Sequence, residues 1–562
     1  MIRKTLLVTA ATFLASSLLF ATVSSAQAQS LDDKALAIVI PGSGDYSKTI
    51  STDSAITQQF FNQGLRMAWS FYFPEAIASY QEASRHDPDH PMPYFGMAHA
   101  MGPNPNSRYA GMPDDPQGEG LKAIRKALDN IGNGTAKEQD MVNTLYVLYN
   151  QTANADKQER DKAYLEALRE LHNKYPKDAD IGSMFAAAHM SMGRWDYWNA
   201  DGSAKPGTQD AVTALEAAMN SQPYHPGANH LYIHLMEASM QPELALPAAQ
   251  KLESLVPIAG HMVHMPGHIY LRVGEYEKAI DINERSQLVD LQFAEIWGDM
   301  PFPNIGTYPL SHRIHAPHAL DFVRYAASLQ GSYAISIEAA ERGAASVGTD
   351  AAAIDRGQKR VAQAWLVDKI FGKWDNILGT EQSHSGTPYL DGMWSYVTGS
   401  ALAATGQISM AEAQLVNLRK MSVDETADQA RVGPTAASHI LKLAGFALEG
   451  EIREAQGDLD AAIEAYTMAV ELEDQNNYTE PPDWSQPIRH YLGAALLEAD
   501  RAEDAESVYR QDLQWNQLNG WSSWGLYQAL VAQGKTEEAQ ILNLQFQSLW
   551  RNADVILERS RF

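Results

Sequence analysis

The sequence predicts an all-α protein made of stacked helical hairpins, and three observations support this fold class. First, the segment 75–88 spaces small, aromatic and proline residues in a pattern that returns along the chain. Second, its equivalent positions lie 34 residues apart, at Ala211, Ala245 and Ala279, and again at Ala505 and Ala539. Third, alternating apolar patterns bounded by hairpin turns, which would indicate strands, are scarce. A period of 34 residues is typical of a helix-turn-helix unit in a stacked array.

Each residue type in the pattern has a physical role in a helical hairpin. The first copy consists of Ala76, Tyr80, Ala83 and Pro88. Small residues let the paired helices approach, and proline breaks the chain before the next unit. Looser copies begin five residues after a glycine that can end the first helix, at Ser336, Ala411 and Ala462. The pattern resembles the tetratricopeptide repeat (TPR), which implies a right-handed TPR-type solenoid of at least seven or eight units.

The N-terminus has the features of a Sec-type export signal. Arg3 and Lys4 precede an apolar run over residues 6–23, and Ala26 and Ala28 supply the small residues that a signal peptidase prefers. We expect a signal peptide over residues 1–28, cleaved after Ala28, and a periplasmic or secreted protein; a retained membrane anchor is the alternative. No second apolar stretch approaches the roughly 20 residues that cross a bilayer, so we expect no stable membrane insertion after cleavage.

The mature chain is predicted to contain two arrays separated by an irregular insertion. We expect a flexible lead-in over residues 29–54, an N-terminal TPR array over 55–295, an insertion over 296–317 and a C-terminal TPR array over 318–562. The insertion is rich in Gly, Pro, Asn and aromatic residues. Similar turn-rich segments cover 102–120, 195–207 and 474–487, and long loops inside a regular array are usually functional lids or packing collars.

Composition limits the partners and the chemistry. The formal charge of −26 argues against a nucleic-acid partner, because phosphate binding needs a positive surface. The chain has no cysteine, which excludes disulfides, thiolate metal ligands and a cysteine nucleophile. Any metal site must therefore use His, Asp, Glu, Met or water.

Histidines concentrate between residues 225 and 318, where nine of the seventeen lie. Two His-x-x-x-His pairs, one at His230 and His234 and one at His264 and His268, are 34 residues apart and so occupy the same positions of consecutive repeats. His261, His318 and Glu237 fall three or four positions from them in the same register, and residues at this spacing share one face of a helix. In the TPR proteins that the pattern resembles, this face of the first helix lines the concave groove.

This arrangement predicts a metal site. Histidines at i and i+4 are the geometry of zinc-binding helices, and nitrogen-rich ligation suits copper, zinc or iron. The predicted metal ligands are His230, His234, His261, His264, His268 and His318. Glu237 and Asp321 are candidates for a ligand, for a group that orients an imidazole, or for a general base that would make them catalytic.

Three longer motifs resemble a family of exported bacterial TPR proteins. They are HPGANHLYIHLMEAS (225–239), HMVHMPGHIYLRVG (261–274) and EPPDWSQPIRHYLGAAL (480–496). The resemblance covers most of the mature chain and implies an exported TPR protein with a His-rich central groove. Asp321 stands where the family pattern has a second histidine, and a carboxylate can still coordinate a metal.

Two classes of function follow from the sequence. The first is a periplasmic solenoid that binds a transition metal in its concave groove, and the sequence leaves open whether it is a metal-dependent enzyme. The second is a peptide- or protein-binding TPR scaffold of the cell envelope without metal, in which the histidines make ordinary hydrogen bonds. In both, we expect a small molecule or peptide in the groove.

Overall fold

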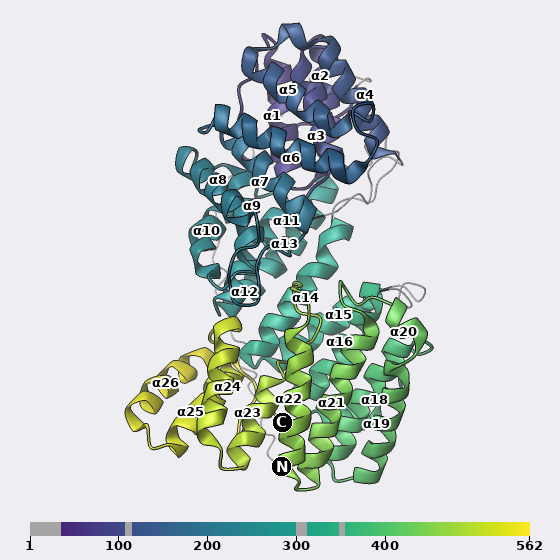
Figure 1. Ribbon diagram of the computed structural model, residues 1–562, viewed down its shortest axis with the longest axis vertical. Helices are drawn as coiled ribbons and strands as arrows, with labels where there is room; N and C mark the ends of the chain where they lie inside the picture. Colours follow the sequence, from purple (N-terminus) through teal and green to yellow (C-terminus); the bar gives the residue numbers. More distant parts are fainter. Residues whose placement is uncertain (1–34, 107–114, 299–311, 348–354) are drawn as a thin grey trace, which may run out of the picture.

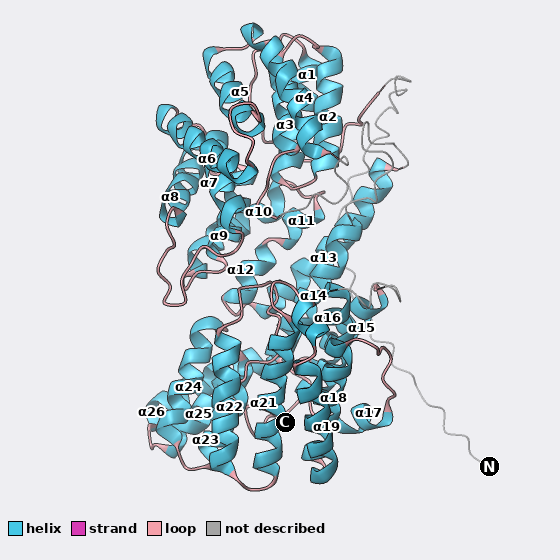
Figure 2. Cartoon of the chain, turned by 45° about the vertical axis from the view of Figure 1, so that its right-hand side comes forward, coloured by secondary structure: helices cyan, strands magenta, loops and turns pink. Residues whose placement is uncertain are grey.

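The computed structural model describes residues 35–106, 115–298, 312–347 and 355–562, and within these ranges the regular structure is helical (Figures 1 and 2). Two isolated β-bridges occur there, and no strand. The predicted all-α solenoid of TPR type is confirmed. The predicted signal peptide, residues 1–28, lies outside the described residues, as does most of the predicted insertion.

The first part of the chain forms the upper half of the molecule in Figure 1. Its helices are α1 (Ala55–Trp69), α2 (Phe73–His86), α3 (Pro91–Ala100), α4 (Pro116–Asp129), η1 (Ile131–Asn133), α5 (Ala136–Tyr149), α6 (Lys157–Lys174), α7 (Ala179–Gly193), α8 (Thr208–Ser221), α9 (Pro226–Met236), η2 (Pro242–Ala245), α10 (Leu246–Leu255), α11 (Gly260–His264), α12 (Pro266–Arg272) and α13 (Tyr276–Trp297).

The second part forms the lower half. Its helices are α14 (His312–Gln330), α15 (Tyr333–Ala345), α16 (Asp355–Ile370), α17 (Trp374–Gly379), α18 (Pro388–Ala404), α19 (Ile408–Ser422), α20 (Glu425–Gln429), α21 (Ala437–Ala455), α22 (Leu459–Asp474), α23 (Arg489–Glu498), α24 (Ala502–Trp515), α25 (Gly520–Ala532), α26 (Thr536–Leu549) and η4 (Trp550–Asn552).

The small residues that set the repeat register are buried where paired helices meet. Those with no exposed surface are Ala76, Ala211, Ala245, Ala279, Ser336, Ala411, Ala462 and Ala505. The aromatic position of the repeat packs against glycine: a Cβ at Gly64 or Gly96 would lie 2.7 or 2.5 Å from the ring of Tyr80. The missing side chains therefore make room for the tyrosine between α1 and α3.

Glycines that follow the first helix of a hairpin adopt left-handed backbone. They include the three that the repeat pattern singled out, Gly331 (φ +83°), Gly406 (φ +78°) and Gly457 (φ +79°). In the turn between α1 and α2, Phe71 takes this position with φ +62°, and the N–H of Tyr72 closes the turn onto the carbonyl of Met67 at 2.9 Å. Left-handed backbone costs an L residue about 1–2 kcal/mol, so packing around Phe71 must compensate for that strain.

Residues 35–54 pack against the helices, which differs from the flexible lead-in that we expected. Gln63 on α1 accepts a hydrogen bond from the N–H of Ile40 at 2.8 Å. The ammonium group of Lys48 lies 3.0 Å from a carboxylate oxygen of Asp178 and of Asp180. These buried polar contacts hold the segment in place because its backbone groups need partners away from water.

The two halves of the chain meet near α12 and α14 (Figure 2). The Tyr276 hydroxyl donates to the carbonyl of Gln517 at 2.7 Å, and the Arg272 guanidinium lies 3.7 Å from the ring centroid of Trp515. The loop between α22 and α23 also reaches α9, where the Tyr478 hydroxyl donates to Glu237. This contact places a segment of the second half against the histidine-bearing helices of the first.

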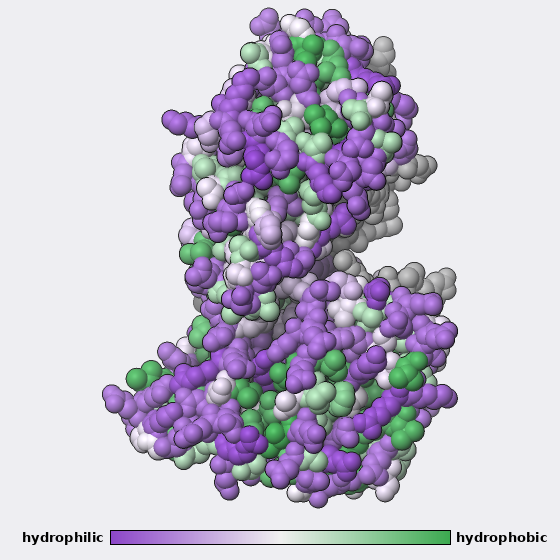
Figure 3. All heavy atoms as spheres, in the orientation of Figure 1, coloured by the Kyte–Doolittle hydropathy of each residue, from purple (hydrophilic) through white to green (hydrophobic). Residues whose placement is uncertain are grey.

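The surface is mainly polar. The face drawn in Figure 3 is largely hydrophilic over both halves, with small apolar areas scattered between. Among the residues that the structure describes, none of the helices has the length and apolar character that a membrane span requires.

Candidate metal centre

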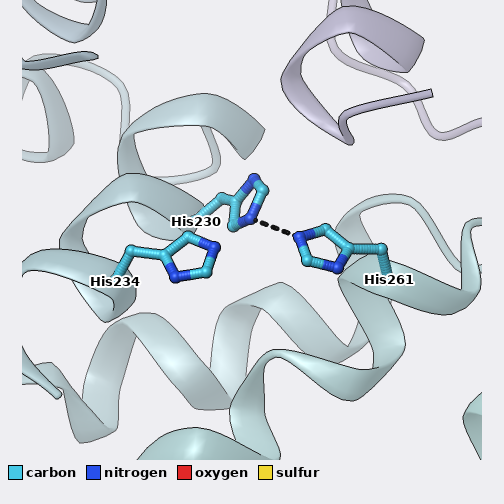
Figure 4. Close-up of side chains that lie close together, drawn as sticks. All are labelled: His230, His234 and His261. Carbon is cyan, nitrogen blue, oxygen red and sulfur yellow. Dashed lines mark hydrogen bonds between the residues drawn. The ribbon is translucent and has the colours of Figure 1, made fainter. Parts of the chain in front are cut away.

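Six histidines from four helices form two adjacent groups. The first triad consists of His230 and His234 from α9 and His261 from α11 (Figure 4). The second triad consists of His264 from α11, His268 from α12 and His318 from α14. Within each triad one ring nitrogen of every histidine lies within 4.8 Å of the others. All six residues are those that the sequence predicted as metal ligands.

The division between the two triads falls inside α11, between His261 and His264. Pro266, which has no N–H, separates α11 from α12 immediately after His264 and Met265. The N–H of His268 consequently bonds to the carbonyl of Met265, a turn tighter than α-helix. Within α11, His261 contacts α9 through His230, with Nε2 atoms 3.0 Å apart. His264 instead contacts His318, with ring centroids 4.9 Å apart.

Four of the histidines are oriented by an oxygen that accepts a hydrogen bond from Nδ1. The first triad uses the carbonyl of Trp69, 2.6 Å from His230 Nδ1, and Glu237 Oε1, 3.0 Å from His234 Nδ1. These acceptors fix the proton on Nδ1, so Nε2 is the unprotonated nitrogen that carries the lone pair. Metal-ligating histidines usually have such a partner on the other ring nitrogen.

The second triad follows the same rule. His264 Nδ1 donates to Asn283 Oδ1, while the Asn283 amide N–H donates to the carbonyl of Ala279 at 2.7 Å. His268 Nδ1 donates to Glu237 Oε2 and lies 3.1 Å from Glu480 Oε2. The Nε2 lone pairs of His264 and His268 therefore face each other at 2.7 Å. Two lone pairs at this distance repel unless a cation, either a proton or a metal ion, lies between them.

Glu237 links the two triads. Its two carboxylate oxygens accept from histidines of different triads, and Oε2 also accepts from the Tyr478 hydroxyl at 3.0 Å. Burial raises the pKa of this carboxyl to about 8, because the fully enclosed charge loses its hydration; hydrogen bonds with Tyr478, Glu480 and Trp195 and the charge of Arg272 act in the opposite direction. A cation bound beside it would also favour the ionised form.

Two phenylalanines cover the two triads. The ring of Phe71 lies 4.4 Å from that of His230 and 5.4 Å from that of His261, centroid to centroid. Phe322 does the same for the second triad, 4.8 Å from His264 and 4.5 Å from His268. The strained backbone of Phe71 thus places an aromatic ring against the first triad. Strain of this kind concentrates at functional sites.

The histidines are more enclosed than the open groove that we expected. Five of them are almost fully buried, and only the side chain of His318, at 20% exposure, reaches the surface. The turn that carries Phe71 and the loop that carries Tyr478 and Glu480 cover the face that would otherwise line a groove.

Asp321 does not join the cluster. Its carboxylate is paired with the Arg360 guanidinium at 2.9 Å, so its predicted roles as a ligand or proton-transfer group do not fit its position. Glu237 is placed as predicted, next to the histidines. His225 caps α9 and contacts Asp180 at 3.1 Å, and the side chains of His312 and His315 lie outside the described ones.

Several residues that complete the site were not predicted from the sequence. Glu480 lies within 4.8 Å of His234 and Glu237, yet it comes from a distant loop. The motif that begins at Glu480 and the turn-rich segment 474–487 were the available signals. Neither Asn283 nor Phe71 had any feature that connected it to the histidines.

Comparisons with known proteins give matches among solved structures. No protein-family model matches the chain, and no curated protein matches it. The human IFIT1 dimer with m7Gppp-AAAA is 13% identical, with a TM-score of 0.34, and the match covers 77% of this chain and 86% of that chain. Monomeric IFIT1 mutants with m7Gppp-AAAA and with Gppp-AAAA are each 11% identical over 81% of this chain and 90% of theirs, with TM-scores of 0.33 and 0.34.

The helices and the cluster define the class of protein. It is a TPR-type helical solenoid with six histidines and two glutamates gathered where its two halves meet. Its register, its left-handed glycine turns and its buried alanines establish the repeat from the chain itself.

Proposed function

We propose that the protein is an exported TPR-type solenoid that binds transition-metal ions in its histidine cluster. The observation that carries the proposal is the orientation of His230, His234, His264 and His268. Each donates Nδ1–H to an oxygen, and Nε2 of His230, His264 and His268 lies against the Nε2 of another histidine. Packing alone does not explain why the Nε2 atoms of His264 and His268 lie 2.7 Å apart.

The ligand set favours copper, zinc or iron. Imidazole nitrogen suits these metals, whereas calcium and magnesium prefer oxygen. Three histidines around one ion leave a coordination position open, as in catalytic sites that activate water or oxygen. Glu237 is the residue placed to hold or move a proton there, because it contacts a histidine of each triad and the Tyr478 hydroxyl.

Export is the second part of the proposal. It is supported by the order of charged, apolar and small residues over residues 1–28. A periplasmic metal site built from histidine does not depend on the thiol redox state of its compartment.

A metal-free peptide scaffold is supported less well. A peptide would have to contact the histidines from solvent, and among the six only His318 has substantial exposure.

Metal analysis of the purified protein tests the proposal. The wild-type chain and the His490→Ala variant are expected to retain stoichiometric transition metal, while His264→Ala and His268→Ala lose it in part or in full. His490 is the matched control because it is a fully buried histidine that contacts Asp512 at 3.1 Å outside the cluster. Substoichiometric metal that is equal in all four proteins would contradict the proposal.

A further inference from the structure

The two triads are separate ligand sets rather than one. The shortest contacts between ring nitrogens lie within a triad: the Nε2 atoms of His230 and His261 are 3.0 Å apart, and those of His264 and His268 are 2.7 Å apart. Six imidazoles around a single ion would bring all donor nitrogens within roughly 4.2 Å of one another, since metal–imidazole bonds are about 2.0–2.1 Å. Among the described residues, the nitrogens gather within 4.8 Å only in threes.

We infer that the cluster holds two metal ions, one in each triad, as a binuclear centre. This inference rests on the proposed metal-binding function and specifies its stoichiometry. The first half of the chain alone supplies the first triad. The second triad is completed by His318 from α14, which opens the second half.

The carboxylates between the triads fit a pair of ions. Glu237 orients one histidine of each triad through its two oxygens. Glu480 lies 3.1 Å from His268 and 3.7 Å from His318, and it also groups with His234 and Glu237. Two divalent ions on neutral imidazoles bring four positive charges into a buried site, and these two carboxylates are the anions that offset part of that charge.

The same carboxylates make the two ion positions interdependent. A histidine held by one oxygen of Glu237 cannot shift toward its ion without moving the oxygen that holds the histidine of the other triad. Loading one triad should therefore fix Glu237 and preorganise the other, which gives positive cooperativity between the two binding steps.

Enclosure limits what else can bind to the ions. Phe71 and Phe322 lie against the triads, and five of the six histidines are almost fully buried. This burial restricts any further ligand of the ions to a small molecule, such as hydroxide, dioxygen or azide. Of the six histidines, His318 is the one whose exposure marks a path from solvent.

The test uses one variant in each triad, His261→Gln and His318→Gln, with His490→Gln as the buried control outside the cluster. Each protein is loaded with Cu²⁺ and separately with Zn²⁺, freed of excess metal, and assayed for metal per chain. The wild-type chain and His490→Gln should hold two ions, and each triad variant one. Paramagnetic resonance of the Cu²⁺ forms adds a second readout, since two neighbouring ions couple magnetically and a lone ion does not.

The possible results of this assay distinguish the two-ion inference from the metal-binding function on which it rests. A single ion in the wild-type chain that is lost in both triad variants would overturn the binuclear inference and leave metal binding intact. Absence of bound metal from the wild-type chain would overturn both. If circular dichroism shows His261→Gln to be unfolded, the wild-type stoichiometry and the presence or absence of magnetic coupling decide the question. Azide should change the spectrum of the two-copper form; an unchanged spectrum would overturn the assignment of a small further ligand.

Discussion

Replacing Glu237 by glutamine should weaken metal binding at both triads. The glutamate is fully buried and uses Oε1 for His234 and Oε2 for His268 and Tyr478. Glutamine offers a single carbonyl oxygen, so one histidine keeps its acceptor and the other faces an amide N–H. Two donors cannot bond to each other, and the displaced imidazole must turn or change tautomer.

The expected loss of metal affinity follows from the role of Glu237 in orienting His234 and His268. Removing the partner that orients a ligating histidine typically costs 10–100-fold in metal affinity, or about 1.4–2.7 kcal/mol. An unsatisfied buried N–H adds about 1–3 kcal/mol of lost folding stability in the metal-free protein. Competition titration against a chromophoric chelator measures the first quantity, and urea unfolding of the metal-free chain measures the second.

A matched control separates metal binding from the loss of a buried carboxylate. Glu451 is buried, accepts from Lys369 at 2.8 Å and does not belong to the histidine cluster. Glu451→Gln should lower stability and leave metal affinity unchanged. A folded Glu237→Gln protein that binds metal as tightly as the wild type would refute the assigned role of Glu237.

Three further predictions concern the fold. Phe71→Gly should be more stable than Phe71→Ala by about 1–2 kcal/mol in urea unfolding, because both lose the ring and only glycine relieves the left-handed strain; equal stabilities would contradict this. Burial lowers the pKa of His99 to about 4, so the folded state resists protonation of this histidine. The free energy of unfolding should therefore fall by about 3 kcal/mol between pH 6.5 and 4. The His99→Gln variant should not show this decrease, and a pH profile identical to that of the wild type would contradict the prediction. Gly331→Ala should destabilise the chain more than Gly457→Ala, as melting temperatures would show, because a Cβ at Gly331 would meet Trp550 at 2.4 Å whereas Gly457 borders open space; equal melting temperatures would speak against this packing.

The repeat register was available from the sequence because its physical cause is local. Alanine at positions such as Ala245 and Ala279 reflects the close approach of paired helices, and both are fully buried. The same register aligned the two His-x-x-x-His pairs, since residues four apart on a helix share a face. This alignment predicts that the six histidines lie close together, and in the structure they form two adjacent groups.

The division into two triads could not be predicted, because it depends on contacts between segments that are far apart in the sequence. His261 and His264 lie on the same short helix, α11, yet His261 contacts His230 and His264 contacts His318. Tyr478 reaches Glu237 across 241 residues of sequence, and no periodicity relates positions so far apart. The sequence also offered no sign that Arg360 would pair with Asp321 and remove it from the site.

X-ray absorption spectroscopy of the metal-loaded protein tests metal binding by the histidine cluster most directly. It measures the identity and distance of the atoms around the ion without depending on any variant. The cluster predicts nitrogen and oxygen neighbours at about 2.0–2.1 Å, with outer-shell scattering from about three imidazoles per ion, as expected for two triads of histidines. A spectrum without imidazole scattering, with oxygen neighbours alone, would contradict it.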